Sequence, residues 1–337
     1  MKTSKLSCLY YPTTCVLVDD DKFFLNSIIL KLNPNIPYKT YLDPKEALNA
    51  LKNLKTQNQF LSEIVSANPD SEEYAENQYQ VNLKISNIFQ QAYSRNHYGQ
   101  ISVIVVDYAM PQMNGAELLK NLSDVPIKKI MLTGQADESF AVQLFNEGII
   151  HKFILKKDTQ SLAEMINQAI GELQDKYFHD LSEFVLQNLP PQLNICLSDP
   201  VFIDLFNQVK NDAAASSYYL LDASGSFLFL DDSGTPTWLI VKTEDEIREF
   251  AQQAEYEGAP KELLESLKKG EVIAHFNNFD EYVDATNGDW SKYLFPAKIV
   301  KGVKQYHYSI LKSLPGFPID QNKIFPFSEY LNSNSST

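Results

Sequence analysis

Four short apolar runs of this chain each end in polar residues suited to phosphate or metal chemistry. Asp19 and Asp20 follow the run CVLV, and Asp107 follows ISVIVV. Thr133 follows KIML, and Lys156 follows FIL. In a parallel α/β sheet the carboxyl ends of the strands meet at one edge, where ligands bind. The sequence therefore predicts that these five side chains converge on a magnesium and phosphoryl site.

The first half of the chain alternates short β-branched runs with helical patterns. This alternation is typical of βαβ units, because parallel strands need a long crossover connection that is usually a helix. The five expected strands lie at residues 15–18, 38–41, 101–106, 129–132 and 152–155. We therefore expect an α/β domain with a five-stranded parallel sheet.

A polar insertion, at about residues 56–98, separates the second helix from the third strand and is rich in Gln, Asn, Glu and Ser. Its later part, VNLKISNIFQQAY, places Val81, Ile85 and Ile88 on one helical face. We expect an extended second helix, a polar loop near residues 68–76, and a further helix that leads into the third strand. The pattern is compatible with a surface insertion that has no binding role and with a partner-binding hairpin.

A long helical pattern follows the fifth strand, at about residues 158–189. Asp158 or Thr159 can cap it, and no proline interrupts it before Pro190. Its apolar positions recur every three or four residues: Leu162, Ile166, Ala169, Leu173, Tyr177, Leu181 and Phe184. The later turns need a packing partner, so a helical dimer contact and an intramolecular linker both remain open.

The last third of the chain has a different pattern. The run SYYLLDASGSFLFLDDSGTPTWLIV gives three strand-like segments separated by glycine-containing turns, which predicts an antiparallel meander. Thr243 and Glu246 have the spacing of a capping box for a helix that Gly258 ends, and a second helix ends at Gly270. The segments VIAHF, LFPAKIV and QYHYSIL complete an α+β module.

These patterns divide the chain into an α/β domain at residues 1–157, a linking helix at 158–189 and an α+β domain at 192–330. A length of 337 residues suits two hydrophobic cores better than one. A formal net charge of −14, with no stripe rich in Lys or Arg, argues against direct DNA binding. Neither a membrane-length apolar run nor a secretory leader pattern is present, so we expect no membrane insertion and a cytoplasmic location.

Three neighbouring carboxylates repel one another unless a hard cation neutralises them, and Mg²⁺ prefers such oxygen ligands. We expect Asp20 and Asp107 to bind the ion directly, Asp19 to hold a coordinated water, and the carbonyl of Ala109 to add a ligand. Asp107 is also the candidate nucleophile for phosphoryl transfer. The candidate residues are Asp107, Thr133 and Lys156 for the phosphoryl group and Asp19, Asp20, Asp107 and Ala109 for the metal.

The segments VLVDDDKFFL, VIVVDYAMPQMNGAELL, IMLTGQ and FILKKD resemble the receiver domain of two-component response regulators, over about residues 12–175. The resemblance implies a flavodoxin-like fold, a sensor histidine kinase or phosphotransfer protein as phosphoryl donor, and a requirement for Mg²⁺. It also implies that Thr133 is the switch hydroxyl, that Lys156 binds the phosphate, and that Phe153 is the switch aromatic residue. Lys157 departs from the family pattern, in which a proline usually follows the conserved lysine.

In this family the face that responds to phosphorylation commonly dimerises, so the resemblance implies a homodimer of the phosphorylated chain. The α+β domain has no helix-turn-helix pattern and no recognised catalytic motif. A protein-binding, dimerising or small-ligand-binding output is therefore expected. A receiver-controlled enzyme acting on a nucleotide-like substrate and a phosphate sink are the alternatives. An atypical regulator of a quorum-sensing circuit is also compatible with the chain, although no motif establishes it.

Several acidic and histidine side chains of the α+β domain are candidates for a second catalytic or metal site. Asp222 and Asp231 lie in Asp-Ser-Gly-type turns, where aspartate is ordinary turn chemistry. His275 and His307 alternate with apolar residues, a pattern typical of hydrogen-bonded strand histidines rather than ligands. We therefore expect no metal centre in this domain.

Overall fold

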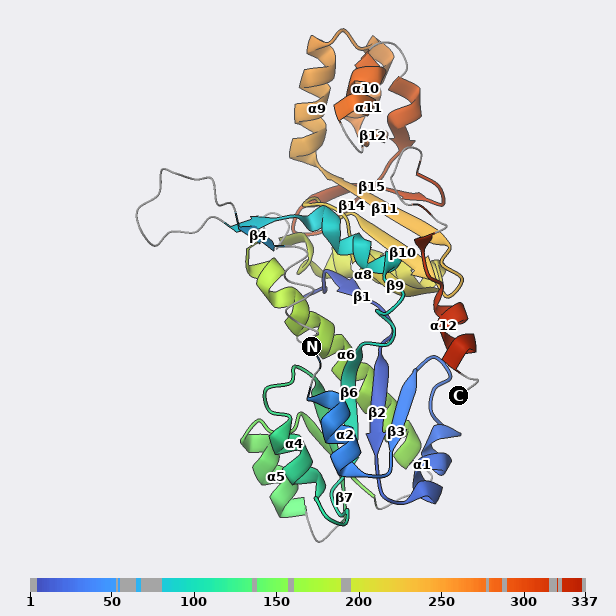
Figure 1. Cartoon of the computed structure of the whole chain (residues 1–337). Helices are drawn as coiled ribbons and strands as arrows, with labels where there is room; N and C mark the ends of the chain where they lie inside the picture. The colour runs from blue at the N-terminus through green and yellow to red at the C-terminus, as the bar shows by residue number, and fades with distance from the viewer. Residues whose placement is uncertain are drawn as a thin grey trace. The chain divides into compact units, whose positions relative to one another are not determined.

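The structure, a computed structural model, describes residues 5–52, 54, 65–67, 81–134, 138–156, 161–188, 195–276, 279–286, 290–314, 320 and 323–334 (Figure 1). The chain divides into two compact units, each described here by itself. The parallel-sheet unit comprises Tyr11–Val81, Arg95–Leu181 and Ser333–Thr337. The antiparallel-sheet unit comprises Met1–Tyr10, Asn82–Ser94 and Ser182–Asn332.

The parallel-sheet unit contains the five-stranded sheet that the sequence predicts. Its strands are β2 (Thr14–Val18), β3 (Tyr38–Tyr41), β6 (Ile101–Asp107), β7 (Lys128–Thr133) and β8 (Lys152–Leu155). They pair in parallel in the order β3-β2-β6-β7-β8, which confirms the flavodoxin-like expectation. The strand order reverses between β2 and β6, and ligands of such sheets bind at this switch point, beyond the carboxyl ends of the strands.

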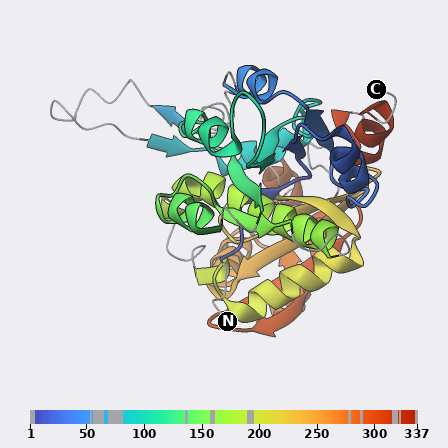
Figure 2. The same ribbon diagram turned by 90° about the horizontal axis from the view of Figure 1, so that it is seen from below.

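Helices cover both faces of this sheet, as Figures 1 and 2 show. α1 (Lys22–Ile29) and the first part of α6 (Leu162–Gln187) pack on one face. α2 (Pro44–Leu51), α4 (Gly115–Asn121) and α5 (Glu138–Asn146) pack on the other. Because both faces are covered, all seven residues of β6 are buried.

The antiparallel-sheet unit is built on a six-stranded sheet of order β1-β9-β10-β11-β15-β14. Its strands are β1 (Leu9–Tyr10), β9 (Ala215–Leu220), β10 (Phe227–Asp231), β11 (Pro236–Thr243), β14 (Lys298–Lys301) and β15 (Gln305–Leu311). The meander β9-β10-β11 confirms the prediction from the glycine-containing turns. α8 (Pro200–Asp212) covers one face, with the Phe206 ring 4.8 Å from that of Phe227 and 5.1 Å from that of Phe229.

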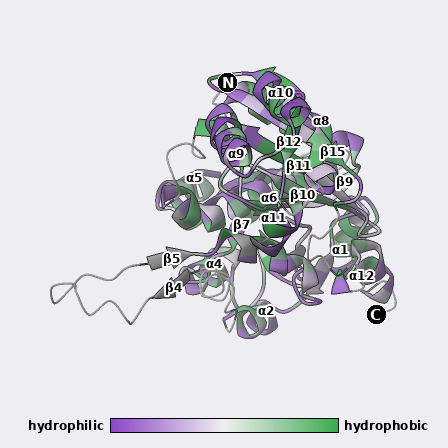
Figure 3. Cartoon of the chain, turned by 90° about the horizontal axis from the view of Figure 1, so that it is seen from above, coloured by the Kyte–Doolittle hydropathy of each residue, from purple (hydrophilic) through white to green (hydrophobic). Residues whose placement is uncertain are grey.

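A helical insertion leaves this sheet after β11 and returns to it at β14. It contains α9 (Glu244–Tyr256), α10 (Lys261–Lys269), β12 (Val272–Ala274), α11 (Phe279–Thr286), η3 (Trp290–Tyr293) and β13 (Leu294–Pro296). The predicted capping box is present, because Thr243 N–H donates to the Glu246 carboxylate at 2.8 Å and Glu246 N–H donates to Thr243 Oγ1 at 3.3 Å. α10 ends at Gly270 as predicted. Both α9 and α10 mix hydrophilic and hydrophobic positions (Figure 3).

The sequence predictions differ from the structure in several segments. Val81–Leu83 is a strand, β5, paired with β4 (Val65–Ala67), and the helix after it, η1 (Ile85–Tyr93), is a 3-10 helix. LFPAKIV is divided at Ala297 into β13 and β14, which belong to different sheets. α8, α11 and the C-terminal helix α12 (Phe327–Asn334) were not expected from their sequence patterns. The expected loop at 68–76 lies outside the described residues.

The two units do not follow the domain limits 1–157, 158–189 and 192–330. β1 lies upstream of the parallel sheet in sequence yet pairs with β9, and α6 continues from one unit into the other at Ser182. α6 has 26 residues, as the long helical pattern indicated, while its candidate caps Asp158 and Thr159 lie outside the described residues. Among the helices that the structure describes, none is long and apolar enough to cross a membrane.

Candidate functional site

The strand ends of the parallel sheet bring together four of the predicted side chains. Asp19 follows β2 and Asp107 is the last residue of β6, and both are buried. Asp20 lies beside them and is exposed. Carboxylate oxygens of these three residues lie within 4.8 Å of one another. Lys156 follows β8, and its backbone N–H donates to the carbonyl of Thr133 at 2.9 Å.

The ammonium of Lys156 joins the two buried carboxylates. Its Nζ lies 2.7 Å from Asp107 Oδ1 and 2.8 Å from Asp19 Oδ2. Burial alone lowers the pKa of Lys156, but its hydrogen bonds to Asp107 and Asp19 outweigh this effect and raise the pKa overall. Burial raises the pKa of Asp19, and the Lys156 bond partly offsets the increase. The lysine is therefore held as a cation at the centre of the site.

An aromatic ring of α1 supports the same ammonium. Lys156 Nζ lies 4.1 Å from the centroid of the Phe24 ring, within the range of a cation–π interaction. α1 is anchored nearby, because the Asp21 side chain accepts hydrogen bonds from the N–H groups of Phe23 and Phe24 and so caps the helix. Sequence reasoning missed Phe24 as a site residue, since only the tertiary structure brings α1 against the residue after β8.

The donor set fits a hard divalent cation. Three carboxylates carry three negative charges, and Lys156 compensates one of them, so the site keeps a surplus of two. Clustered carboxylate oxygens are the ligands that Mg²⁺ prefers. Asp19, Asp20 and Asp107 are therefore suitably placed to hold the ion. The N–H of Ala109 donates to Asp107 Oδ2 at 3.1 Å, which orients this carboxylate at the strand end.

The loop after β6 depends on a glycine. Gly115 N–H donates to the carbonyl of Tyr108 at 2.9 Å, which folds the loop back onto the strand. A Cβ atom at Gly115 would stand 2.2 Å from the carbonyl oxygen of Asp107, closer than any real contact. Gln112 has a positive φ of 67° in the same loop. The chain can therefore pass behind Asp107 only with glycine at position 115.

The two remaining candidates lie in the neighbouring strands β7 and β8. Thr133 is fully buried at the end of β7, and its hydroxyl donates to the carbonyl of Gly134 at 3.2 Å. Phe153 in β8 is half-buried and packs on the core beneath α4 and α5. Thr133 therefore presents its hydroxyl to a neighbouring backbone group, while Phe153 packs against the core and stays partly exposed.

Comparisons with known proteins agree with this geometry. The family model "Response regulator receiver domain" matches residues 72–167. The solved structure of the response regulator LqsR from Legionella pneumophila is 32% identical, with a TM-score of 0.79 over 97% of this chain and 95% of that chain. The adenylate cyclase from Rhodopirellula baltica is 23% identical, with a TM-score of 0.35 over 52% of this chain and 98% of that chain. The receiver domain of the Francisella response regulator 1452 is 18% identical, with a TM-score of 0.32 over 49% of this chain and 98% of that chain.

No curated protein matches the chain. The similarity to LqsR nevertheless spans both units, so it is not confined to the receiver domain. The strand order of the parallel sheet and the acidic cluster at its carboxyl end agree with this match. The chain therefore belongs to the response regulator family, and its parallel-sheet unit is the receiver domain.

Proposed function

We propose that this response regulator accepts a phosphoryl group on Asp107 from a histidine kinase or a phosphotransfer protein. The observation that carries the proposal is the Asp107 carboxylate, which lies 2.7 Å from the Lys156 ammonium and beside two further carboxylates. A carboxylate is a competent nucleophile for phosphorus when nearby cations neutralise the charge of the transferred group.

In the proposed transfer, a carboxylate oxygen of Asp107 attacks the phosphorus of the partner's phosphohistidine. An O–P bond forms as the P–N bond breaks, and the leaving imidazole nitrogen keeps the electron pair and takes up a proton. Lys156 donates to the phosphoryl oxygens from its place beside Asp107. Asp19, Asp20 and Asp107, with the carbonyl of Ala109, would hold Mg²⁺, which supplies charge neutralisation when bound.

The proposed switch uses Thr133 and Phe153. A phosphoryl group adds close to two negative charges and strong acceptor oxygens, which compete with Gly134 for the Thr133 hydroxyl proton. Movement of Thr133 changes the packing at the ends of β7 and β8 and leaves space into which Phe153 can turn. The helices that pack around Phe153 then shift, which alters the surface that the receiver presents to a partner.

We infer that this change regulates homodimerisation or protein contacts, and that α6 carries it along the chain because this helix continues from the receiver into the second unit. The match to LqsR supports this proposal, because it extends over the receiver, α6 and the second unit. Participation in a quorum-sensing circuit stays a prediction from the sequence.

Incubation with acetyl phosphate and Mg²⁺, followed by intact-mass measurement, tests the proposal. The wild type should gain the mass of one phosphoryl group, whereas Asp107→Asn and a sample treated with a metal chelator should not. Equal labelling of wild type and Asp107→Asn would exclude Asp107 as the acceptor. Sedimentation of the labelled protein then tests dimerisation. The dimer fraction of the wild type should rise after labelling, and that of Asp107→Asn should not change.

A further inference from the structure

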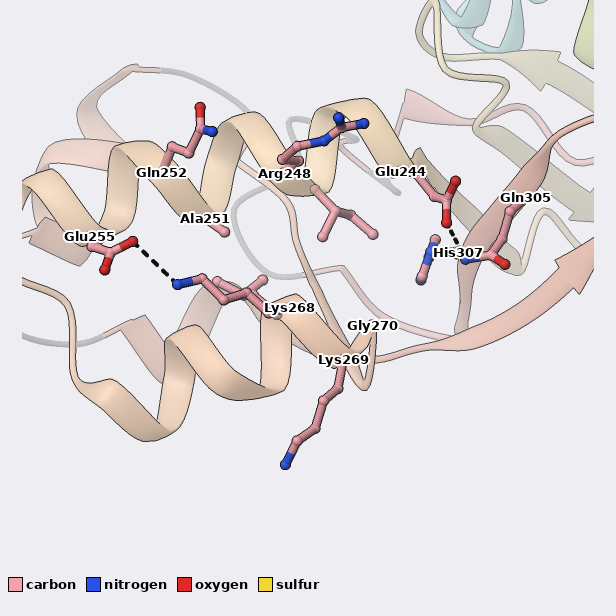
Figure 4. Close-up of a pocket in the computed structure, with 12 residues that line it drawn as sticks. Glu244, Arg248, Ala251, Gln252, Glu255, Lys268, Lys269, Gly270, Gln305 and His307 are labelled. Atoms are coloured by element: carbon pink, nitrogen blue, oxygen red, sulfur yellow. Dashed lines mark hydrogen bonds and ion pairs between the residues drawn. The ribbon is translucent and has the colours of Figure 1, made fainter.

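The second unit contains a cavity of about 520 Å³ where the helical insertion meets the six-stranded sheet (Figure 4). α9 and α10 form its sides, and the start of β15 forms one end. Its volume lies within the usual range for small-molecule sites, about 300–1,000 Å³. No part of the proposed phosphoryl-transfer chemistry uses this cavity.

A buried histidine lies at the β15 end of the cavity. His307 is only 4% exposed, and its Nδ1 has no hydrogen-bond partner among the described residues. The sequence pattern had indicated a hydrogen-bonded strand histidine, and this expectation holds for one ring nitrogen only. An unpaired buried polar atom costs about 1–3 kcal/mol, so such an atom beside a cavity points to a missing partner.

Two hydrogen bonds determine which ring nitrogen of His307 carries the proton. Gln305 Nε2 donates to Glu244 Oε1 at 2.7 Å and lies 3.1 Å from His307 Nε2. The Glu244 contact fixes the amide nitrogen on this side, so its second N–H points to His307 and makes Nε2 the acceptor. With Nε2 as the acceptor, Nδ1 carries the ring proton and is the unsatisfied donor. A ligand must therefore bring an acceptor atom.

Gly270 covers this donor at the end of α10. Its φ is +70°, and a Cβ atom there would stand 2.6 Å from His307 Nδ1. Glycine is required at this approach, because any side chain would collide with the imidazole. Because Gly270 lies against the buried Nδ1, a ligand must displace this backbone segment to reach the donor.

The rest of the lining combines an apolar middle with a charged mouth. Ile247, Ala251 and Leu267 are buried side chains that form the middle. Three cationic and two anionic side chains surround them: Arg248, Lys268, Lys269, Glu244 and Glu255. Figure 4 shows the Lys268–Glu255 ion pair at the end opposite His307. The lining therefore carries a surplus of one positive charge.

Two of the cations are free to change partners. Arg248 pairs with Asp245 and Lys269 lies 4.0 Å from Glu265, and all four side chains are more than 60% exposed. Such surface pairs contribute little free energy, so a ligand anion can compete for the cations. An acceptor group with a negative charge suits both His307 and this mouth.

We propose that this cavity binds a small monocarboxylate with a short apolar chain. The carboxylate accepts the His307 Nδ1 proton. The side chains of Arg248 and Lys269, which point away from the space between α9 and α10 in Figure 4, leave their surface partners and turn toward it. The chain lies along Ile247, Ala251 and Leu267. A ligand of this size binds with a Kd on the order of 0.1–1 mM.

Titration of the full-length protein with hexanoate, followed by ligand-observed NMR and calorimetry, tests this proposal without any phosphorylation step. Hexanoate should bind, and hexanol should bind about tenfold more weakly because it lacks the charge. His307→Leu should lower the affinity at least about tenfold, whereas His307→Gln, which keeps an N–H donor, should retain affinity within about threefold. Circular dichroism establishes that each variant is folded.

A pair of surface substitutions keeps the test valid if His307→Leu does not fold. Arg248→Gln combined with Lys269→Gln should weaken hexanoate binding about three- to tenfold. Lys261→Gln is the matched control, since Lys261 lies on α10 but does not line the cavity. The proposal is overturned if hexanoate does not bind, if it binds both sets of variants as tightly as wild type, or if inorganic phosphate binds in its place.

Discussion

Lys156 Nζ lies 2.7 Å from Asp107 Oδ1, so the receiver site holds the proposed acceptor carboxylate through a lysine that also binds Asp19 at 2.8 Å. One ammonium thus contacts two buried carboxylates and compensates the charge of one of them. A divalent ion at the same carboxylates would compete with this ammonium, and a phosphoryl group on Asp107 would give the lysine a new acceptor. In the proposed mechanism, the position of Lys156 therefore links metal binding to phosphoryl transfer.

Lys156→Gln should separate these two effects. The variant loses the ammonium that contacts the phosphoryl oxygens, so labelling by acetyl phosphate should slow about 10- to 100-fold. Its affinity for Mg²⁺, measured by calorimetry, should rise because the competing cation is gone. Lys152→Gln is the control, since Lys152 pairs with Glu172 at the surface. Unchanged labelling of Lys156→Gln would remove the lysine from the mechanism.

Phe24→Leu tests the aromatic support of the same ammonium. Loss of the ring 4.1 Å from Lys156 Nζ removes a contact of about 0.5–1 kcal/mol, so labelling should slow about two- to fivefold. Phe24→Tyr keeps the ring and should restore the wild-type rate. If both variants label equally well, the ring does not position the lysine.

Gly115→Ala should destabilise the receiver by about 2–4 kcal/mol, because the added Cβ meets the Asp107 carbonyl oxygen at 2.2 Å. Gly171→Ala is the matched control. A Cβ at Gly171, in the interior of α6, meets no atom within 4 Å. This second change should raise the free energy of unfolding by about 0.5–1 kcal/mol. Urea unfolding measures the free energy of unfolding of both variants. An equal effect of the two substitutions would contradict the close approach of Gly115 to the Asp107 carbonyl oxygen.

The sequence predicted the parts of this fold that local signals define. The capping residues Thr243 and Glu246, the helix end at Gly270 and the strand-end carboxylates all depend on neighbouring residues in the chain. β1 was not predicted, because a two-residue strand is recognised only through its pairing with β9, more than 200 positions away. Phe24 and the Gly270–His307 approach were missed for the same reason: each depends on a contact between distant segments.

His151 should make the receiver sensitive to acid. Burial, with the nearby charge of Lys128, lowers the pKa of His151 from 6.5 to about 4, and its Nδ1 accepts a hydrogen bond from Lys129 N–H at 3.1 Å. The unfolded chain binds this proton below pH 6.5 and the folded chain only near pH 4, so the free energy of unfolding should fall as pH drops through this range. We expect a loss of about 1–2 kcal/mol, reduced by partial exposure of the ring.

The check is the pH dependence of urea unfolding in His151→Asn. The asparagine keeps an acceptor for Lys129 N–H but does not titrate, so its stability should vary less between pH 6.5 and 4. His179→Asn, at a half-exposed position of α6, should keep the wild-type dependence. Identical pH profiles for His151→Asn and wild type would show that another group dominates the acid response.

Identification of the phosphorylated residue tests the central proposal most directly. Borohydride reduces an aspartyl phosphate to homoserine, so the modified position can be read by peptide mass spectrometry after labelling with acetyl phosphate. We predict homoserine at position 107 in the presence of Mg²⁺ and none when the metal is chelated. Modification of a different residue, or none at Asp107 under labelling conditions, would contradict the assignment of Asp107 as the phosphoryl acceptor.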